Sequence, residues 1–219
     1  MRHPKGLYAI DSRPYIIAAM SKPEPLRPES YYHLYNRGVN RCNLFTQPSD
    51  YDLFLKLYIR YIDPIAETFA YCFMRNHFHL FVRIKPSQPD SEFPNLTIPA
   101  PSQSFSNLFN AYTKTINQKH YRTGSLFEHP FHRIPVTTDA YFTQLIPYIH
   151  FNPQKHGFVK DFRDWPYSSY GAILSERPTR VQRGQVLAWF EDADRFVDSH
   201  TNPLDVDQIP GAGDDEWME

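Results

Sequence analysis

The sequence predicts an α+β fold in which an antiparallel sheet is covered by helices on one face. Stretches rich in aromatic residues, typical of strands, alternate with stretches whose apolar residues recur at helical spacing. The expected order is strand, helix, strand, strand, helix, extended pair, helix, which suits a small sheet-and-helix sandwich. A length of 219 residues allows one domain with appendages, and 41% apolar residues suffice for a packed core.

Three strands and one helix are expected in the first half of the chain. The strands are 30–37, 67–74 and 77–84. Ser49 is expected to cap a helix, and its apolar face would contain Leu53, Phe54, Leu57, Tyr58 and Tyr61. Five prolines in 85–104 then predict a long loop.

The second half predicts two more helices with an extended pair between them. Apolar spacing favours a helix over 104–119, Gly124 marks a break, and 125–136 is expected to be extended. Thr137 or Thr138 would cap a third helix that stops at Asn152-Pro153. Pro147 lies inside this helix and lacks an N–H, so we expect the helix either to kink there or to begin later.

Charge divides the chain into a basic body and an acidic tail. Residues 191–219 hold 10 acidic residues and one basic residue, whereas 1–190 hold 22 basic and 14 acidic residues. We expect the segment from Glu191 onward to be solvated, or else to lie across a basic DNA groove. The predicted arm, main domain and acidic-tailed extension are 1–29, 30–175 and 176–219.

Cysteine usage and hydropathy favour a cytoplasmic protein with no membrane partner. Cys42 and Cys72 lie in different segments without a CxxC spacing, so reduced thiols are the simplest account. The apolar stretch near the N-terminus, 15–20, is too short for a signal peptide or a membrane span.

His77 and His79 alternate with Phe78 in a predicted strand, so both imidazoles leave the same face of the sheet. Two imidazoles about 7 Å apart along a strand can converge on one divalent ion. Two satisfied polar residues on a half-buried strand would give the same pattern. Considered alone, the pair favours that simpler account.

Tyr148 and Asn152 share one face of the third helix, because four residues are close to one turn. A phenol oxygen can attack phosphorus, and an amide carbonyl oxygen can bind a hard metal ion. A buried aromatic residue and a helix-ending Asn before Pro would also produce this spacing.

Four stretches in this order resemble the REP-associated tyrosine transposases: ESYYHLYNRGVNRCNLF, YCFMRNHFHLFV, GSLFEHPFHRIPV and YIHFNPQKHGFVKDFRDWPYSSY. These enzymes are single-tyrosine HUH transposases, where HUH denotes His-hydrophobic-His. The resemblance extends over about residues 29–172. It leaves out 1–28 and the acidic tail.

The resemblance implies a ferredoxin-like or RRM-like HUH endonuclease fold and a role for each matching residue. His77, His79 and Asn152 would hold Mg²⁺ or Mn²⁺, and Tyr148 would be the nucleophile. The implied activity is cleavage of single-stranded DNA next to palindromic hairpins through a 5′-phosphotyrosine, followed by strand transfer. The protein would be nucleoid-associated when it is bound to DNA. A monomer and a homodimer both remain open.

Basic and polar residues around these motifs are candidates for DNA contacts, although ordinary surface charge would look the same. The candidates are Asn36, Arg37, Arg41, Arg75, Arg133, Lys155 and His156. Other histidines near the motifs are expected to contact DNA or to lie on the surface: His129, His132 and His150. Tyr112 and Tyr121 are rival nucleophiles, and Tyr112 fits the apolar stripe of its helix.

Two departures from the family pattern favour an alternative function, a catalytically silent hairpin-DNA-binding protein. Arg75 stands where the family usually has Pro, and Pro147 directly precedes the tyrosine. A metallohydrolase built on HxH is a weaker alternative, because such enzymes are barrels of about 250 residues with strictly alternating strands and helices.

Overall fold

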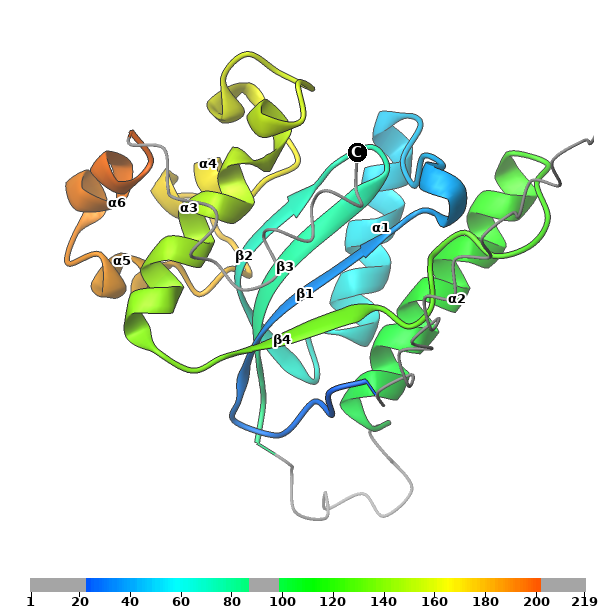
Figure 1. Ribbon diagram of the computed structural model, residues 1–219, viewed down its shortest axis with the longest axis horizontal. Coiled ribbons are helices and arrows are strands. Elements are labelled where there is room, and N and C mark those ends of the chain that lie inside the picture. Colours follow the sequence, from blue (N-terminus) through cyan, green and yellow to red (C-terminus); the bar gives the residue numbers. More distant parts are fainter. Residues whose placement is uncertain (1–22, 87–98, 202–219) are drawn as a thin grey trace, which may run out of the picture.

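Four antiparallel strands in the order β2-β3-β1-β4 form the centre of the computed structural model, which describes residues 23–86 and 99–201 (Figure 1). The predicted α+β class is confirmed. The strands are β1 (Tyr31–Arg37), β2 (Ala66–Phe73), β3 (His77–Ile84) and β4 (His132–Val136). The helices are η1 (Val39–Arg41), α1 (Pro48–Tyr61), α2 (Pro101–Lys119), α3 (Asp139–Lys155), η2 (Phe162–Asp164), α4 (Tyr170–Leu174), α5 (Arg183–Trp189) and α6 (Ala193–Ser199).

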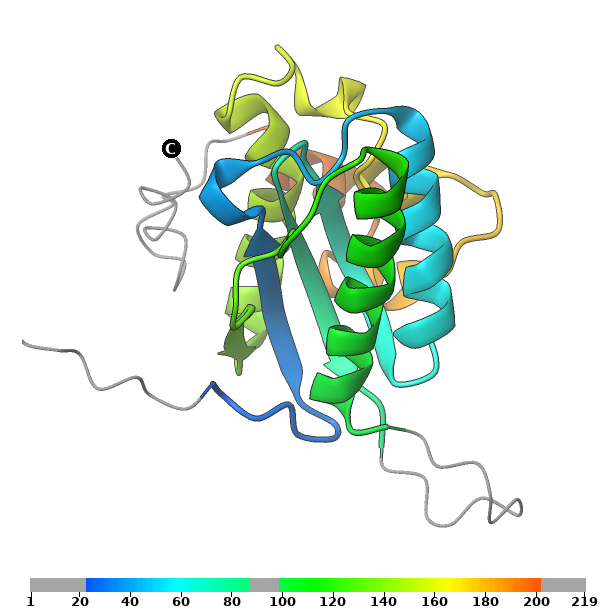
Figure 2. The same cartoon turned by 90° about the vertical axis from the view of Figure 1, so that its right-hand side faces the viewer.

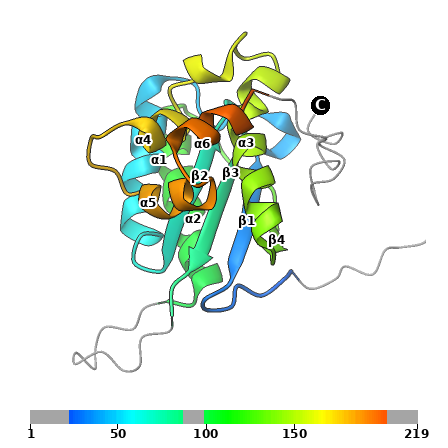
Figure 3. The ribbon, with the colours of Figure 1, turned by 90° about the vertical axis from the view of Figure 1, so that its left-hand side faces the viewer.

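Helices cover both faces of the sheet, which corrects the expectation of a single covered face. Helices α1 and α2 lie on one face (Figure 2), here the α1–α2 face, where Phe78 contacts Phe54 and Phe109. Helices α3 and α5 lie on the opposite face (Figure 3), here the α3 face, where Phe81 contacts Phe142 of α3 and Trp189 of α5. The run Leu80-Phe81-Val82 explains the second layer, since consecutive apolar residues on a strand need cover on both sides.

Helices α1 and α2 both begin at a proline, and neither proline is where the sequence patterns predict the helix to start. Gln47, and not Ser49, is the N-cap of α1, and Pro48 is the first helical residue. Helix α2 likewise begins at Pro101, inside the predicted loop. A proline fits the first helical position because its missing N–H would have no partner there. Residues 87–98 of that loop lie outside the described residues.

Helix α3 begins after Thr138, whose hydroxyl accepts a hydrogen bond from the N–H of Tyr141, and it runs to Lys155. It therefore contains both Pro147 and Pro153. Neither a later start nor a stop at Asn152 is observed. Close packing accounts for the continuity, because Leu145, Ile146 and Ile149 are fully buried against the core. Of the predicted extended pair, only β4 is a strand, and Phe127 forms a single bridge with Gly38.

A chain of buried hydrogen bonds joins α6 to α3. Nδ1 of His150 lies 2.8 Å from Nε2 of His200, and Nε2 of His150 lies 2.7 Å from the hydroxyl of Ser169. At one end His200 Nδ1 donates to the carbonyl of Phe196, and at the other the N–H of Tyr71 donates to Ser169. Burial lowers the pKa of both imidazoles, so each is neutral and carries one ring proton. Because the Phe196 carbonyl can only accept, the proton of His200 lies on Nδ1, and its Nε2 accepts from Nδ1 of His150. Nε2 of His150 then accepts from the hydroxyl of Ser169.

The expectation of a solvated segment from Glu191 onward holds for the acidic side chains of residues 191–201, which are exposed, but it is wrong for two other residues of this stretch. Phe196 is 0% exposed within the main core, and His200 is buried beside it. The rest of the tail, 202–219, lies outside the described residues, as do 1–22 of the predicted arm. Leu26, in the described part of that arm, is buried in the same core. No helix in 23–86 or 99–201 is both long and apolar enough to cross a membrane.

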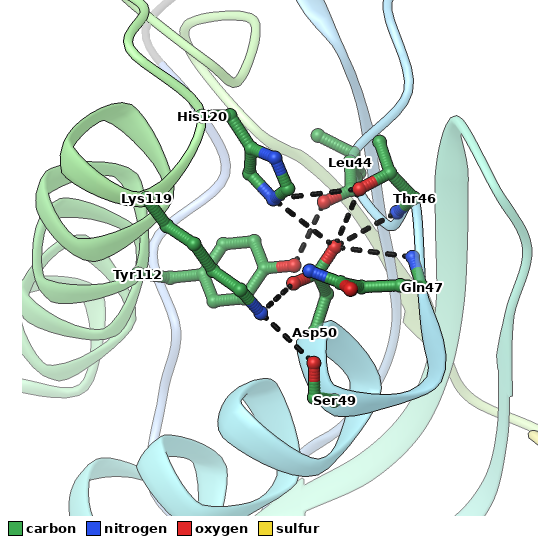
Figure 4. A network of polar contacts seen from close by, with 8 residues as sticks. All are labelled: Leu44, Thr46, Gln47, Ser49, Asp50, Tyr112, Lys119 and His120. Carbon is green, nitrogen blue, oxygen red and sulfur yellow. Dashed lines mark hydrogen bonds and ion pairs between the residues drawn. The ribbon is translucent and has the colours of Figure 1, made fainter.

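A buried carboxylate ties the start of α1 to the end of α2 (Figure 4). Asp50 accepts hydrogen bonds from the backbone and hydroxyl of Thr46, and it forms an ion pair of 2.7 Å with Lys119. Burial raises the pKa of Asp50, but the bonds from Lys119 and Thr46 outweigh burial and bring the pKa to about 2. The carboxylate is therefore ionised and fully partnered at neutral pH.

We predict that Asp50→Asn lowers the free energy of unfolding at neutral pH and makes it less dependent on pH in the acid range. Asp50 has a pKa of about 2 in the folded protein, against an ordinary value of 3.8 for an aspartate in water. Its contribution is therefore complete above about pH 4 and is lost as the pH falls toward 2. The shift in the pKa of Asp50 corresponds to about 2 kcal/mol of the free energy of unfolding. Urea unfolding of the wild type and the variant between pH 2 and pH 7 measures this contribution.

The matched control is Asp161→Asn, which removes an exposed carboxylate paired with Arg163. We expect it to leave the free energy of unfolding almost unchanged, because exposed ion pairs contribute little. If the free energy of unfolding falls equally with pH in wild type and in Asp50→Asn, the Asp50 carboxylate does not have the stabilising role assigned to it.

A second prediction compares two truncations. Deleting 191–219 removes Phe196 and His200 from the core and should lower the free energy of unfolding by about 3–5 kcal/mol. Deleting only 202–219 leaves both side chains in place and should preserve the melting temperature. Thermal unfolding of the two proteins tests this, and equal melting temperatures would refute it. The effect of the tail on DNA affinity is best measured with the shorter deletion.

Candidate active site

The two HUH histidines lie side by side on the α3 face of β3. The ring centres of His77 and His79 are 5.4 Å apart, and both side chains are buried. The sheet register opposes His79 to Tyr35 and His77 to Arg37 of β1. Strand alternation thus brings both rings to one face, as their spacing predicts.

Both imidazoles are neutral at pH 7. Burial and, to a smaller extent, neighbouring basic groups together lower the pKa of His77 to about 3 and that of His79 well below its usual value. A neutral imidazole offers one nitrogen lone pair to a cation.

The Nδ1 atom of each histidine has a hydrogen-bond partner, whereas Nε2 is buried without one. Nδ1 of His77 lies 2.9 Å from Oδ1 of Asn76, and Nδ1 of His79 lies 2.9 Å from Nε2 of His33. Among the described residues, the Nε2 atoms of His77 and His79 have no hydrogen-bond partner. Buried nitrogens of this kind call for a partner.

Helix α3 brings Tyr148 and Asn152 to the same face of the sheet. The Tyr148 ring centre is 5.6 Å from that of His79. The amide nitrogen of Asn152 donates to the carbonyl of Tyr148 at 2.8 Å, which leaves Oδ1 buried without a hydrogen bond. The two residues lie one turn apart, as expected.

The donor set suits a divalent cation. His77 Nε2, His79 Nε2 and Asn152 Oδ1 are uncharged acceptors, each buried and each without a hydrogen bond to any residue of 23–86 or 99–201. Within the described chain, no cluster of three His, Cys, Asp or Glu side chains is arranged to hold a metal ion. A site at the histidine pair therefore needs a ligand of another type, and the amide oxygen of Asn152 is of that type.

Four of the candidate DNA-contact residues surround this site. Lys155 Nζ is 5.7 Å from the Tyr148 ring centre, and the His156 ring centre is 4.9 Å from that of His77. Arg37 adds positive charge near His77 and pairs with Glu128 at 2.8 Å. Arg75 is exposed two residues before His77, with its guanidinium 5.7 Å from the Phe158 ring.

The remaining candidates have other surroundings. Asn36 is buried and bonded to the carbonyl of Glu128. Arg133 lies at a β4 position whose side chain points to the α1–α2 face, bonded to Glu24 and Ser102. Burial lowers its pKa. Arg41 is exposed in η1.

Other candidates from the sequence divide into core and surface. Tyr112 is buried, and its hydroxyl donates to the carbonyl of Leu44, as its apolar stripe predicts. Tyr121 is 98% exposed. His150 is not on the surface but belongs to the buried chain that reaches α6. His129 is exposed, and His132 stacks on Tyr35.

Sequence reasoning missed His33 and Asn76, the partners of the histidine pair. Asn76 directly precedes His77, so its position in the chain was a usable signal. His33 is far away in sequence. It could have been found only by aligning β1 against β3, which opposes Tyr35 to His79 and thereby places His33 diagonally behind His79.

The chain is similar to REP-associated tyrosine transposases in sequence and in fold. It is 28% identical over 106 residues to a putative REP-associated tyrosine transposase of Haemophilus influenzae, a match that covers 48% of this chain and 58% of that protein. The match therefore spans less than two thirds of the relative. No protein-family model matches the chain.

A solved structure shares the fold. It is a REP-associated tyrosine transposase bound to a REP hairpin, with a TM-score of 0.55 and 18% sequence identity. The similarity covers 72% of this chain and 87% of that one. Both comparisons confirm the resemblance inferred from the four motifs.

Proposed function

We propose that the chain is a metal-dependent endonuclease and strand transferase that acts on single-stranded DNA next to hairpins and uses Tyr148 as its nucleophile. The observation behind this proposal is the set of three buried acceptors without hydrogen bonds, His77 Nε2, His79 Nε2 and Asn152 Oδ1. The two histidines lie on the face of the sheet that the Tyr148 ring contacts, and Asn152 follows this tyrosine by one turn of α3. The similarity to a transposase bound to a REP hairpin supports hairpin DNA as the partner.

Each of the chain's own groups has a task in this reaction. The phenol oxygen of Tyr148 attacks the phosphorus and gives its proton to water, while the bond to the 3′ oxygen breaks and this oxygen takes up a proton from water. Lys155 beside the ring favours the developing negative charge of the phenolate. Exposed Arg75 is suited to contact the DNA backbone.

A divalent cation held by His77, His79 and Asn152 would supply Lewis-acid polarisation of a phosphate oxygen. Mg²⁺ and Mn²⁺ both suit a set with an amide oxygen and open positions for water. The product is a 5′-phosphotyrosine and a free 3′ hydroxyl. Because the phosphotyrosine conserves the energy of the broken bond, a later attack by a 3′ hydroxyl can rejoin strands without ATP.

A silent hairpin-binding protein is the second candidate, and the burial of Tyr148 and both histidines favours it. The fold and the basic surroundings would serve binding alone equally well. The two functions differ in whether a covalent intermediate forms.

We predict that the wild-type chain binds Mn²⁺ and that Asn152→Leu weakens this binding by about tenfold or more. Asn152 contributes the oxygen ligand, and Leu has a similar volume without it. Electron paramagnetic resonance of free Mn²⁺ measures the affinity. The matched control is Asn117→Leu, an amide on α2 that bonds to Gly124 and Arg122 and should leave the affinity unchanged.

We further predict that incubation with single-stranded hairpin DNA and Mn²⁺ yields a covalent protein–DNA adduct that Tyr148→Phe abolishes. The phenol oxygen is the attacking atom, so its removal eliminates the reaction while the ring stays in place. Denaturing gel electrophoresis detects the adduct. Tyr121→Phe is the control, because this exposed tyrosine was the rival nucleophile.

Three outcomes are separable. An adduct lost only in Tyr148→Phe supports the proposal, and an adduct lost only in Tyr121→Phe reassigns the nucleophile. Hairpin binding by the wild type without any adduct would establish the silent protein instead.

A further inference from the structure

His33 lies directly behind the metal-binding face of His79 and has no part in the chemistry described so far. It is fully buried on β1. Its Nε2 atom is 2.9 Å from Nδ1 of His79, and the two ring planes are inclined by 22°. The contact is therefore a close hydrogen bond between two imidazoles.

This hydrogen bond contains one proton, and its direction determines what the far side of His79 can do. If Nδ1 of His79 donates, Nε2 of His79 keeps a lone pair. If Nε2 of His33 donates instead, the proton of the neutral His79 lies on Nε2, where it blocks a cation. Only the first arrangement makes His79 a ligand.

We propose that His33 is a positioning residue that accepts the hydrogen bond from Nδ1–H of His79 and so directs the Nε2 lone pair of His79 at the divalent cation. This inference rests on the proposed function, because it requires His79 to bind a cation. A cation at Nε2 of His79 favours the arrangement in which His33 carries its own proton on Nδ1, although this atom is buried and has no hydrogen-bond partner among the described residues.

The other histidine of the pair, His77, has an asparagine and not a histidine as the partner of its Nδ1 atom. Oδ1 of Asn76 can only accept, so the proton of neutral His77 is held on Nδ1 whether or not a cation is present. His33 can both donate and accept. His79 is therefore the ligand whose readiness depends on its partner.

Backbone pairing holds His33 in this position. β1 is paired on both sides, with His33 opposite Phe81 of β3 and Ile134 of β4. The His33 ring also contacts Tyr148, at 6.0 Å between ring centres. Test variants at this position should therefore keep a side chain of similar size.

The experiment compares His33→Leu with His33→Gln in the full chain. The side-chain oxygen of Gln reaches about as far as Nε2 of His and accepts a hydrogen bond, whereas Leu offers no acceptor. We expect His33→Leu to weaken Mn²⁺ binding by about tenfold to a hundredfold and His33→Gln to retain it within about threefold. His150→Gln, in the other buried histidine pair, should leave the affinity unchanged.

Nitrogen-15 NMR of the wild-type histidines with Mg²⁺ gives a readout that is independent of any variant. We expect both His33 and His79 to carry their protons on Nδ1 in the Mg²⁺-bound protein. If His33→Leu fails to fold, this measurement alone tests the proposed role of His33.

Each result has one meaning. A proton on Nε2 of His33 in the Mg²⁺-bound protein, or equal Mn²⁺ affinity in wild type and His33→Leu, overturns the inference and leaves the metal site standing. A wild-type chain that binds neither Mn²⁺ nor Mg²⁺ overturns the metal-dependent function itself. Equal loss in the Leu and Gln variants assigns His33 to packing and also overturns the inference.

Discussion

The alternation of side chains along β3 is the constraint on which both the core and the site depend. Phe78 points to the α1–α2 face and completes the aromatic packing there, while His77 and His79 point to α3. A slip of one residue in the pairing of β1 with β3 would place the imidazoles in the aromatic core. The aromatic packing on the α1–α2 face therefore also fixes the positions of the two histidines on the α3 face.

The sequence predicted well those features that depend on local periodicity. Three of the four strands and three of the helices of the main domain could be found because their apolar residues recur with periods of about two or 3.6. His77 and His79, and likewise Tyr148 and Asn152, share a face for the same reason. These positions follow from spacing within one element, which requires no knowledge of tertiary contacts.

Features set by tertiary contacts could not be predicted in this way. Pro48 and Pro101 begin helices although prolines also mark loops, and α3 continues through Pro147 because burial outweighs the lost hydrogen bond. His33 is recognisable only from the register between two strands. The acidic composition after Glu191 concealed Phe196 and His200, which are one helical turn apart and both buried.

Buried hydrogen bonds restrict the substitutions that related proteins can carry near α6. These bonds run from Tyr71 through Ser169, His150 and His200 to Phe196. The Phe196 carbonyl can only accept, so each neutral histidine must donate toward Phe196 and accept from the neighbour on its other side. Replacing one histidine by an apolar residue would leave the other with an unmatched buried nitrogen. Positions 150 and 200 should therefore covary among relatives, being polar together or apolar together.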